Sequence, residues 1–386
     1  MPSQLKLKNL GYVKKQRKWR KKMKAMSKVT LTLGLMIIVS LFLTSYSSVV
    51  TPELQLDLGE DINTVTPETA IGNLENQEDI NQNGNNSQSS STEPVEEPAE
   101  EPGTVYPQKW ATGDGTVENP WANDCIQKAY AACPTGGTIY LRAGYYELAD
   151  EFTMTKSINI IGEGIQRTFV ISADDYAIFI DTADYVTIKD MTIDGDAQGD
   201  GDNYKSCVYI ENSDYTLLEN LEVKNAGYYG ISLYQVNYSI CQNIYAHDNY
   251  RHGLHPGSDA AGRNKWNVYR DIYAWDNGVC GFNDRGSEAD PDVESYNVFD
   301  NLQCWDNGSH GIIIGNQKGF TLSNSSANGN TGVGIYIFAS EDSNIHDCFA
   351  TFNGKEGLRI YDSSKSINVT NVITKNNNCA EADNKS

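Results

Sequence analysis

A glycine followed by alternating apolar residues recurs along the second half of the chain. These anchor positions are Gly230, Gly253, Gly281, Gly311, Gly334 and Gly357. Their spacings are 23, 28, 30, 23 and 23 residues, and Cys207 holds the same position 23 residues before Gly230. A period in the low twenties with strand-like alternation predicts stacked coils, each burying its inner face against its neighbours. We therefore expect an all-β, single-stranded parallel solenoid with coils of this length.

Side chains alternate across a strand, so the residues one and three positions after each anchor should face the core. These positions are apolar in the regular coils: Val208 and Ile210, Ile231 and Leu233, Ile312 and Ile314, Ile335 and Ile337, and Leu358 and Ile360. The turn before each anchor carries an asparagine, at Asn249, Asn277, Asn307, Asn330 and Asn353. Stacked amides hydrogen-bond from coil to coil, so these residues predict a structural asparagine ladder.

Composition divides the chain into four regions. Residues 1–50 join a basic start to an uncharged, largely apolar run, which is typical of either a signal peptide or a membrane anchor. Residues 51–105 hold thirteen Asp or Glu and no Lys or Arg, as expected of a disordered acidic stalk. The β-helix domain is expected at 106–378 and a polar tail at 379–386. The N-terminus would then lie in or through the membrane, with the rest extracytoplasmic, anchored at the cell surface or secreted.

Helical spacing from Pro120 to Cys133 predicts a helix that caps the open end of the first coil.

Residues 106–386 hold 19 Lys or Arg and 38 Asp or Glu, a net charge of −19, which argues against nucleic acid or anionic lipid as a partner. Cys241 and Cys348 take the place of apolar core residues in the repeat, so most cysteines should be reduced and buried. Cys125 and Cys133 are the best local candidates for a disulfide. We expect a monomer.

The coil length, the asparagine ladder, the cap helix and the opening Gly137-Thr-Ile-Tyr-Leu-Arg-Ala-Gly-Tyr-Tyr resemble the pectin-lyase-like superfamily. This resemblance implies a right-handed parallel β-helix, but lyases, epimerases, hydrolases and adhesins share that fold. Three segments, starting at Asn267-Val-Tyr-Arg-Asp, Gly281-Phe-Asn-Asp-Arg and His310-Gly-Ile-Ile-Ile, are similar to the disaggregatase-related β-helix proteins of methanogenic archaea. That likeness implies cleavage of a chondroitin-like, uronate-containing sheath and transfers no catalytic residue.

This sequence departs from two better-known catalytic patterns. Mannuronan epimerases and alginate lyases carry Tyr-Gly-Phe-Asp-Pro-His where this chain has His252-Gly-Leu-His-Pro-Gly. The polygalacturonase pattern is echoed by Ser309-His-Gly-Ile-Ile-Ile-Gly, but it needs an Asp pair one coil earlier, where Val279-Cys-Gly-Phe has none. The second departure argues against the inverting hydrolysis of that family.

The two long coils carry insertions, roughly at 257–266 and 285–296, and histidines, arginines and carboxylates gather there. Repeat proteins use insertions for binding, so we expect one wall of a sugar-binding groove. The catalytic candidates are His252, His255, Asp284 and His310; the substrate-binding candidates are Tyr234, Arg251, Asp259, Arg263, Asn283 and Arg285. For any one residue, a tolerated surface side chain is an equally good interpretation.

Asp284 stands at an inward position, where an unpaired carboxylate is costly. It should be paired with Arg285 or Arg263, or turned outward as an acid or base, and we favour the outward orientation. β-Elimination of a uronate needs a cation, a base and an acid, which Arg285 or Arg251, His255 or His252, and Tyr234 or Tyr250 could supply. Hydrolysis needs two carboxyl groups flanking the bond, and the sequence leaves both reactions open.

Aspartates alternate along the segment 194–202, as in a calcium loop, giving Asp194, Asp196, Asp200 and Asp202 as candidate ligands. The match covers only the first half of an EF-hand loop, and a solvated acidic turn is the simpler interpretation. The sequence as a whole predicts an exported β-helix that binds and cleaves an acidic extracellular polysaccharide, as a lyase or a glycoside hydrolase. The alternative is a non-catalytic adhesin or envelope protein built on the same coil.

Overall fold

The computed structural model describes residues 103–106, 126–148, 150–172, 176–196, 205–257, 263–287, 294–361 and 363–378. The chain divides into two units, Met1–Asn63 and Thr64–Ser386, and every described residue belongs to the second. The signal or anchor segment, the tail and all of the expected stalk except residues 103–105 lie outside the described residues. Within the described ranges, no helix is long and apolar enough to cross a membrane.

Two parallel sheets make up the described part of the second unit. The fourteen-stranded sheet contains β1 (Thr104–Val105), β2 (Thr138–Tyr140), β3 (Gly144–Leu148), β5 (Asn159–Ile161), β6 (Thr168–Ser172), β8 (Thr187–Asp194), β10 (Leu217–Lys224), β12 (Ile240–His247), β14 (Val268–Trp275), β16 (Val298–Trp305), β18 (Thr321–Ser323), β19 (Ser326–Asn328), β21 (Glu341–Thr351) and β23 (Lys365–Lys375). The nine-stranded sheet contains β4 (Phe152–Met154), β7 (Tyr176–Asp181), β9 (Ser206–Glu211), β11 (Tyr229–Tyr234), β13 (His252–Gly257), β15 (Cys280–Asp284), β17 (Ile312–Gly315), β20 (Ile335–Phe338) and β22 (Leu358–Ile360).

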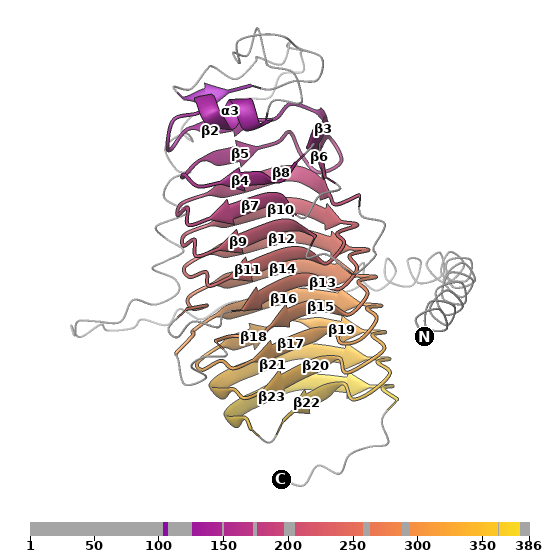
Figure 1. Cartoon of the computed structure of the whole chain (residues 1–386). Helices are drawn as coiled ribbons and strands as arrows, with labels where there is room; N and C mark the ends of the chain where they lie inside the picture. Colours follow the sequence, from indigo (N-terminus) through magenta and orange to yellow (C-terminus); the bar gives the residue numbers. More distant parts are fainter. Residues whose placement is uncertain are drawn as a thin grey trace, which may run out of the picture. The chain divides into compact units, whose positions relative to one another are not determined.

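Each coil contributes one strand to the nine-stranded sheet, so its order follows the chain from β4 to β22. The coils stack from β2 and β4 at one end to β22 and β23 at the other (Figure 1). Pairing is in register with the anchors, because Ile231 lies opposite Val208 on one side and Leu254 on the other. The predicted parallel solenoid is confirmed, and β1 begins it two residues before the boundary expected at residue 106.

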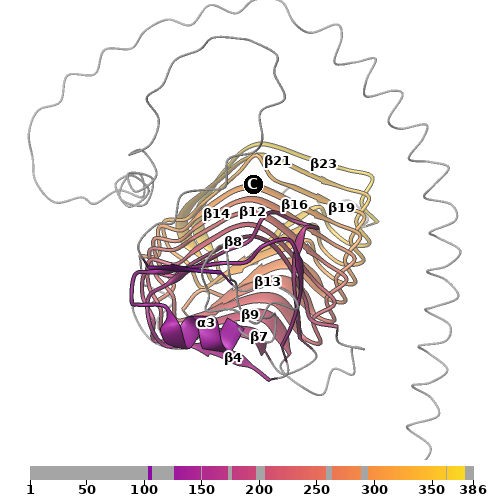
Figure 2. The same ribbon diagram turned by 90° about the horizontal axis from the view of Figure 1, so that it is seen from above.

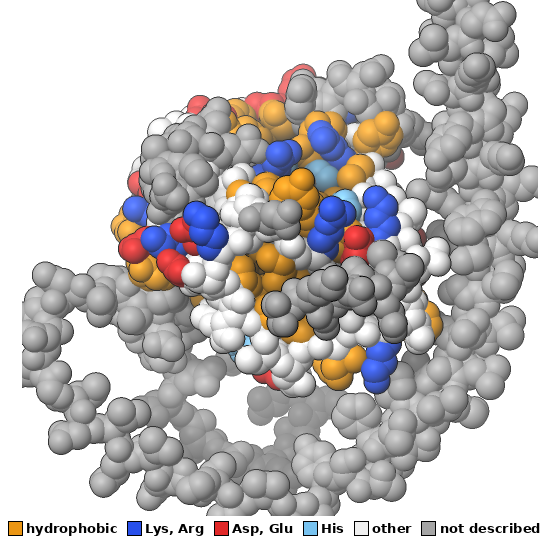
Figure 3. Space-filling model, turned by 90° about the horizontal axis from the view of Figure 1, so that it is seen from below, with side chains coloured by type: hydrophobic (Ala, Val, Ile, Leu, Met, Phe, Trp, Pro, Cys, Tyr) orange, Lys and Arg blue, Asp and Glu red, His pale blue; other side chains and the backbone are white. Residues whose placement is uncertain are grey.

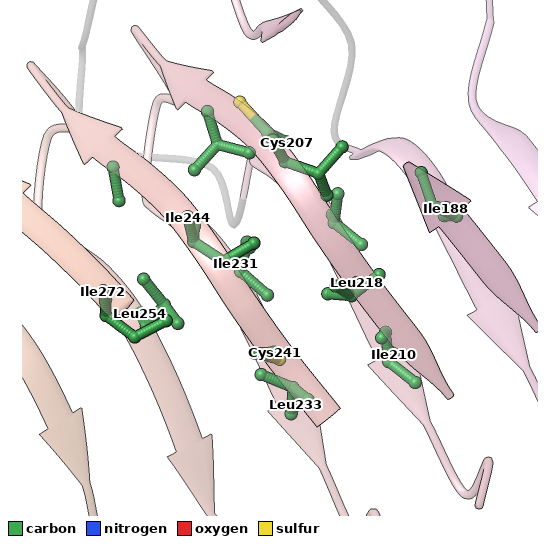
Figure 4. Close-up of a cluster of buried hydrophobic side chains, with 14 of the residues drawn as sticks. Ile188, Cys207, Ile210, Leu218, Ile231, Leu233, Cys241, Ile244, Leu254 and Ile272 are labelled. Atoms are coloured by element: carbon green, nitrogen blue, oxygen red, sulfur yellow. The ribbon is translucent and has the colours of Figure 1, made fainter. Parts of the chain in front are cut away.

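The core lies between the two sheets and is built from the inward positions of the repeat. Figure 4 shows Ile231 beside Ile244 and Leu254 beside Ile272 of the facing sheet, and Leu233 belongs to the same cluster. All five side chains are at most 1% exposed. Burying an aliphatic side chain of this size stabilises a fold by about 1.5–3 kcal/mol, so repetition over successive coils supplies the stability.

The cysteines of the described residues are buried, and all of them except Cys280 belong to the same core. Cys133, Cys207, Cys241, Cys280, Cys304 and Cys348 are buried free thiols, as expected for most of them. Cys133 is one of these, so the disulfide considered for Cys125 and Cys133 is not formed. Cys125 itself lies outside the described residues. Burial raises the pKa of the Cys207 thiol to about 12, so this thiol stays neutral and unreactive.

The predicted asparagine ladder is confirmed along the turn that precedes the nine-stranded sheet. The amide nitrogen of Asn249 donates to Oδ1 of Asn277 over 2.9 Å, and the same bond recurs between Asn277 and Asn307 at 3.0 Å. Each Oδ1 also accepts the backbone N–H of the preceding asparagine. The ladder continues through Asn330 and Asn353 to Asn377. It satisfies buried backbone groups that would otherwise have no partner.

The long strands of the fourteen-stranded sheet bend at a residue in the left-handed region, and seen along the stack these bends give the coil its corners (Figure 2). Asn243, Asp271 and Asn301 have φ values of 52°, 53° and 53°. Short polar side chains tolerate this conformation. They also bond between coils, since Nδ2 of Asn301 lies 2.5 Å from Oδ1 of Asp271.

Helix α3 (Ile126–Ala132) lies at the N-terminal end of the stack, where the cap helix was predicted (Figure 2). It buries Ile126 and Ala129 in the core, and the ring of Tyr130 packs edge-on against Phe152 at 5.4 Å. The residues expected to begin this helix, from Pro120 to Cys125, lie outside the described ranges. The described turns nevertheless cover apolar edges that the first coil would expose.

Candidate functional site

The outer face of the nine-stranded sheet carries the chemistry-bearing residues. The residue two positions after each anchor forms one outward file, which runs Phe179, Tyr209, Ser232, His255, Asn283, Ile313, Tyr336 and Arg359. His252, the residue before the anchor Gly253, also faces outward, since its ring lies 5.2 Å from that of His255. Glycine is required at the anchor between them, because a Cβ on Gly253 would lie 2.5 Å from the carbonyl oxygen of Gly281.

His255 is held in one tautomer by the next coil. Its Nδ1 lies 2.9 Å from the backbone carbonyl oxygen of Asn283. A carbonyl only accepts, so Nδ1 carries the proton and Nε2 keeps a free lone pair. Burial lowers the pKa of His255 to about 4; the hydrogen bond to Asn283 opposes this, and Arg285 and Arg251 add to it. The imidazole is therefore a neutral, oriented base at neutral pH.

His252 has the opposite arrangement and no free nitrogen. The backbone N–H of Cys280 donates to its Nδ1 over 3.2 Å, so Nε2 carries the proton. Nδ2 of the Asn283 side-chain amide lies 3.1 Å from Nε2. Burial lowers the pKa of His252 well below its usual value, and His255, Arg251 and Arg285 add to that effect. His252 thus positions Asn283, whose carbonyl orients His255.

Two tyrosines that the sequence analysis did not single out complete the cluster. The ring of Tyr229 stacks on His252 at 5.2 Å and lies 4.5 Å from the ring of His255. Arg251 donates to the hydroxyl oxygens of Tyr228 and Tyr229, and its guanidinium lies 5.0 Å from the Tyr228 ring. Burial raises the pKa of Tyr229, and its hydrogen bond to Tyr228 adds to the rise, so the phenol stays protonated. Their register could have revealed them, because Tyr228-Tyr229 precedes Gly230 as Arg251-His252 precedes Gly253.

Arg285 follows β15 directly and is exposed. Its backbone N–H donates to the carbonyl oxygen of Pro256, which fixes it beside β13. Its charge lowers the pKa of both His252 and His255, so the guanidinium lies within electrostatic range of the two rings. We use "histidine cluster" for Tyr229, Arg251, His252, His255 and Arg285.

Asp284 does not face outward, and this expectation was wrong. The residue is 0% exposed, and its Oδ1 accepts the backbone N–H of Gly286 at 2.7 Å and Nδ2 of Asn264 at 2.8 Å. It is paired with neither Arg285 nor Arg263. Burial raises the pKa of Asp284 to about 6. The physical reason is that the insertion returns Asn264 and Gly286 to the core as hydrogen-bond donors, which lowers the cost of burial.

The other candidates lie apart from the histidine cluster or outside the described residues. Arg263 makes a two-pronged ion pair with Asp214, at 2.8 and 3.1 Å, and also donates to the carbonyl of Gln235. Tyr234 is half-buried opposite Glu211 on one side and Gly257 on the other. Asp259 lies outside the described residues, as does much of each insertion. Whether the insertions form a wall therefore stays a prediction.

His310 lies farther along the same face, before β17. The backbone N–H of Val333 donates to its Nδ1 over 3.0 Å, which leaves Nε2–H outward as a donor. Its ring stacks on Tyr336 at 5.6 Å. Burial and the charge of Lys355 lower the pKa of His310, against the hydrogen bond from Val333. His310 is thus suited to donate a hydrogen bond rather than to accept a proton.

The calcium hypothesis stays a prediction. Oδ1 of Asp194 accepts the backbone N–H of Asp196 at 3.0 Å and Nδ2 of Asn225 at 2.9 Å, as in a structural turn. Asp200 and Asp202 lie outside the described residues. Among the residues that are described, no group of three or more His, Cys, Asp or Glu side chains is arranged to hold a metal ion.

Residues 104–385 match the family described as "Pel9A-like, right handed beta helix region". The chain belongs to this family. The match covers the whole described solenoid and confirms the right-handed β-helix expected from the pectin-lyase-like resemblance. The narrower likeness to disaggregatase-related proteins stays a prediction. No curated protein matches the chain significantly.

Solved structures share the fold at low sequence identity. The protein titled "Geobacillus virus E2 - ORF18" is 14% identical with a TM-score of 0.53, over 70% of this chain and 60% of that one. The structure of pectate lyase Pel9A is 16% identical with a TM-score of 0.49, over 72% and 78% of the two chains. The Azotobacter vinelandii mannuronan C-5 epimerase AlgE6 A-module is 17% identical with a TM-score of 0.41, over 72% and 98%. This chain thus spans less than two thirds of the virus protein. Sequence identities this low show a similar fold and nothing more.

Proposed function

We propose that this protein is a polysaccharide lyase that cleaves a uronate-containing extracellular polymer by β-elimination. The observation that carries the proposal is the tautomer of His255, whose Nδ1–H is bound to the Asn283 carbonyl and whose Nε2 is left as a base. The charges of Arg285 and Arg251 act on this base, and a protonated phenol lies against its ring. A family named after a pectate lyase accords with this reaction.

The reaction begins with the uronate carboxylate bound by Arg285 and Arg251. Neutralising the carboxylate stabilises the carbanion that forms when the C5 proton leaves. Nε2 of His255 takes this proton. The incoming negative charge offsets the field of the two arginines, which raises the pKa of His255 while substrate is bound.

The electron pair released at C5 forms the C4–C5 double bond, and the bond from C4 to the glycosidic oxygen breaks. Tyr229 donates its proton to that oxygen, and solvent returns the proton from His255 to Tyr229. Arg251 favours proton transfer from Tyr229 to the glycosidic oxygen. It donates a hydrogen bond to the phenol oxygen of Tyr229, which leaves the phenol proton for the leaving group.

Hydrolysis is the weaker alternative because it needs two carboxyl groups beside the bond. On the described strands β11, β13, β15 and β17 the one carboxylic acid is Asp284, which is buried. The proposal keeps the exported, surface-anchored or secreted location suggested by the N-terminus, and keeps a chondroitin-like polymer as one substrate candidate.

The test is incubation of the protein with pectate, alginate, chondroitin and hyaluronan, with two readouts. A lyase produces new reducing ends together with the ultraviolet absorbance of unsaturated uronate. Reducing ends without that absorbance would identify a hydrolase and overturn the proposal. Binding without either product would identify the non-catalytic adhesin.

A further inference from the structure

A second cluster of cations lies on the same outer face, four coils beyond His255. Arg359 belongs to the file that runs from His255 through Asn283, Ile313 and Tyr336. Four strand spacings of ~4.8 Å put it roughly 19 Å from His255 along the stack. Lys355 lies two positions before the anchor Gly357, as Arg251 does before Gly253. Seen from the C-terminal end, histidine atoms are bordered by Lys and Arg side chains (Figure 3).

Aromatic rings hold the guanidinium of Arg359. It lies 5.8 Å from the ring centre of Tyr336 and 5.7 Å from that of Tyr361. Cation–π contacts of this kind restrain an arginine without using its N–H donors. Its ion pair with Glu356 is long at 3.7 Å, and the Arg359 side chain is 43% exposed. The guanidinium is therefore positioned and still able to bind an anion.

Two further donors face the same place. His310 keeps its Nε2–H outward and stacks on Tyr336, and the charge of Lys355 acts on the His310 ring. Glu356 carries the one opposing charge in this group. A guanidinium, an ammonium and a neutral N–H beside two tyrosine rings match the parts of an acidic sugar: the anion takes the donors and the sugar ring packs on the aromatic surface.

We infer that Lys355, Arg359, His310 and Tyr336 form a second, non-catalytic subsite that binds another carboxylate of the same polymer chain. This inference rests on the proposed function, because it assumes that the polymer is cleaved at His255. It adds that the substrate is a long polyanion that contacts the protein at two separate acidic sugars. A short oligosaccharide cannot span from one cluster to the other.

The experiment compares Arg359→Gln and Lys355→Gln with the unchanged protein, using whichever uronate polymer is cleaved and its trisaccharide. On the polymer, we expect each change to raise KM by about twofold to fivefold, the upper range for one half-exposed charge pair, with kcat unchanged. On the trisaccharide, both constants should stay the same. The dependence of KM on salt should also weaken, because one screened charge contact is lost.

Arg167→Gln is the matched control. Arg167 is also an exposed arginine in an ion pair with a nearby glutamate, Glu163, but it lies in an early coil before β6. It should leave KM unchanged. An unchanged polymer KM in both subsite variants would overturn the subsite while leaving the lyase intact, as would an equal change on polymer and trisaccharide. Absence of cleavage of every polymer by the unchanged protein would instead overturn the proposed function, and the subsite with it.

Discussion

Nδ1 of His255 lies 2.9 Å from the carbonyl oxygen of Asn283, a residue of the neighbouring coil. The side-chain amide of the same Asn283 meets Nε2 of His252. One asparagine thus connects the two histidines, and they end in opposite tautomers. The two histidines therefore have different roles. His255 has a free lone pair on Nε2, whereas His252 holds Asn283, the residue that orients His255.

His255→Ala should abolish most of the turnover. Loss of a general base lowers turnover by about 10²–10⁴-fold, whereas removal of an outward side chain costs little stability. Turnover and thermal unfolding measured on the same preparation separate the two effects. His346→Ala, in the fourteen-stranded sheet, is the control and should behave as the unchanged protein. Unchanged turnover in the His255 variant would remove this residue from the mechanism.

Arg285→Gln should both slow the reaction and shift its pH dependence. Loss of a preorganised charge contact to the transition state costs about 10²–10³-fold in turnover. The positive charge of Arg285 lowers the pKa of His255, so its removal should raise the pKa on the acid side of the kcat/KM profile. Arg270→Gln in β14 is the control. A profile that stays unshifted would contradict the electrostatic link between these two residues.

Asp284→Asn should leave turnover close to normal, because the carboxyl is buried away from the outer face. The folded-state pKa of about 6 is higher than the ordinary 3.8, so the folded protein prefers the protonated acid. Its contribution to the free energy of unfolding is largest below the ordinary pKa and falls as pH rises through about 6, by about 3 kcal/mol. Denaturant titrations at several pH values should show this fall in the unchanged protein and its absence in the variant. A large loss of turnover in a folded variant would count against the buried position.

Glu222→Gln should destabilise the fold at neutral pH. His247 donates to this carboxylate and, with Thr192, holds the pKa of Glu222 down to about 2 despite burial. The carboxylate therefore stabilises the fold above its ordinary pKa of 4.5, and this contribution is lost as pH falls toward about 2. Burial lowers the pKa of His247, but its hydrogen bonds to Asp248 and Glu222 outweigh burial and raise that pKa. The stability that His247 contributes is therefore lost as pH rises. Unfolding of the two proteins should converge in acid; an equal difference at every pH would refute the linkage.

Asn277→Ala should cost more stability than its single side chain suggests. Oδ1 of Asn277 accepts both the N–H and the amide of Asn249, and each buried donor left without a partner costs about 1–3 kcal/mol. Chemical denaturation measures the loss. Asn368→Ala is the matched control, since it removes a similar amide contact, to Asn344, at an exposed position. Equal losses in the two variants would show that burial does not decide the strength of the ladder.

Much of the fold follows from the sequence, because its signals are local and repeated. Alternation on a strand identifies Ile231 and Leu233 as inward, and the same spacing in every coil reveals the period and the asparagine ladder. The same rule places His255 outward in line with Ser232, and the pairing of β11 with β13 confirms this alignment. Such features need only neighbouring positions on one strand and a constant repeat.

The partners of the functional groups were decided by the tertiary structure. Alternation set Asp284 at an inward position, but only the folded insertion supplies Gly286 and Asn264 as its donors. Arg263 finds Asp214 across 49 residues of sequence, and the tautomer of His255 depends on a carbonyl 28 residues away. The physical reason is that a strand fixes which face a side chain takes, whereas its hydrogen bonds depend on the register of the adjoining coils. Core packing and loop length together set that register. Neither can be read from the sequence of a single strand.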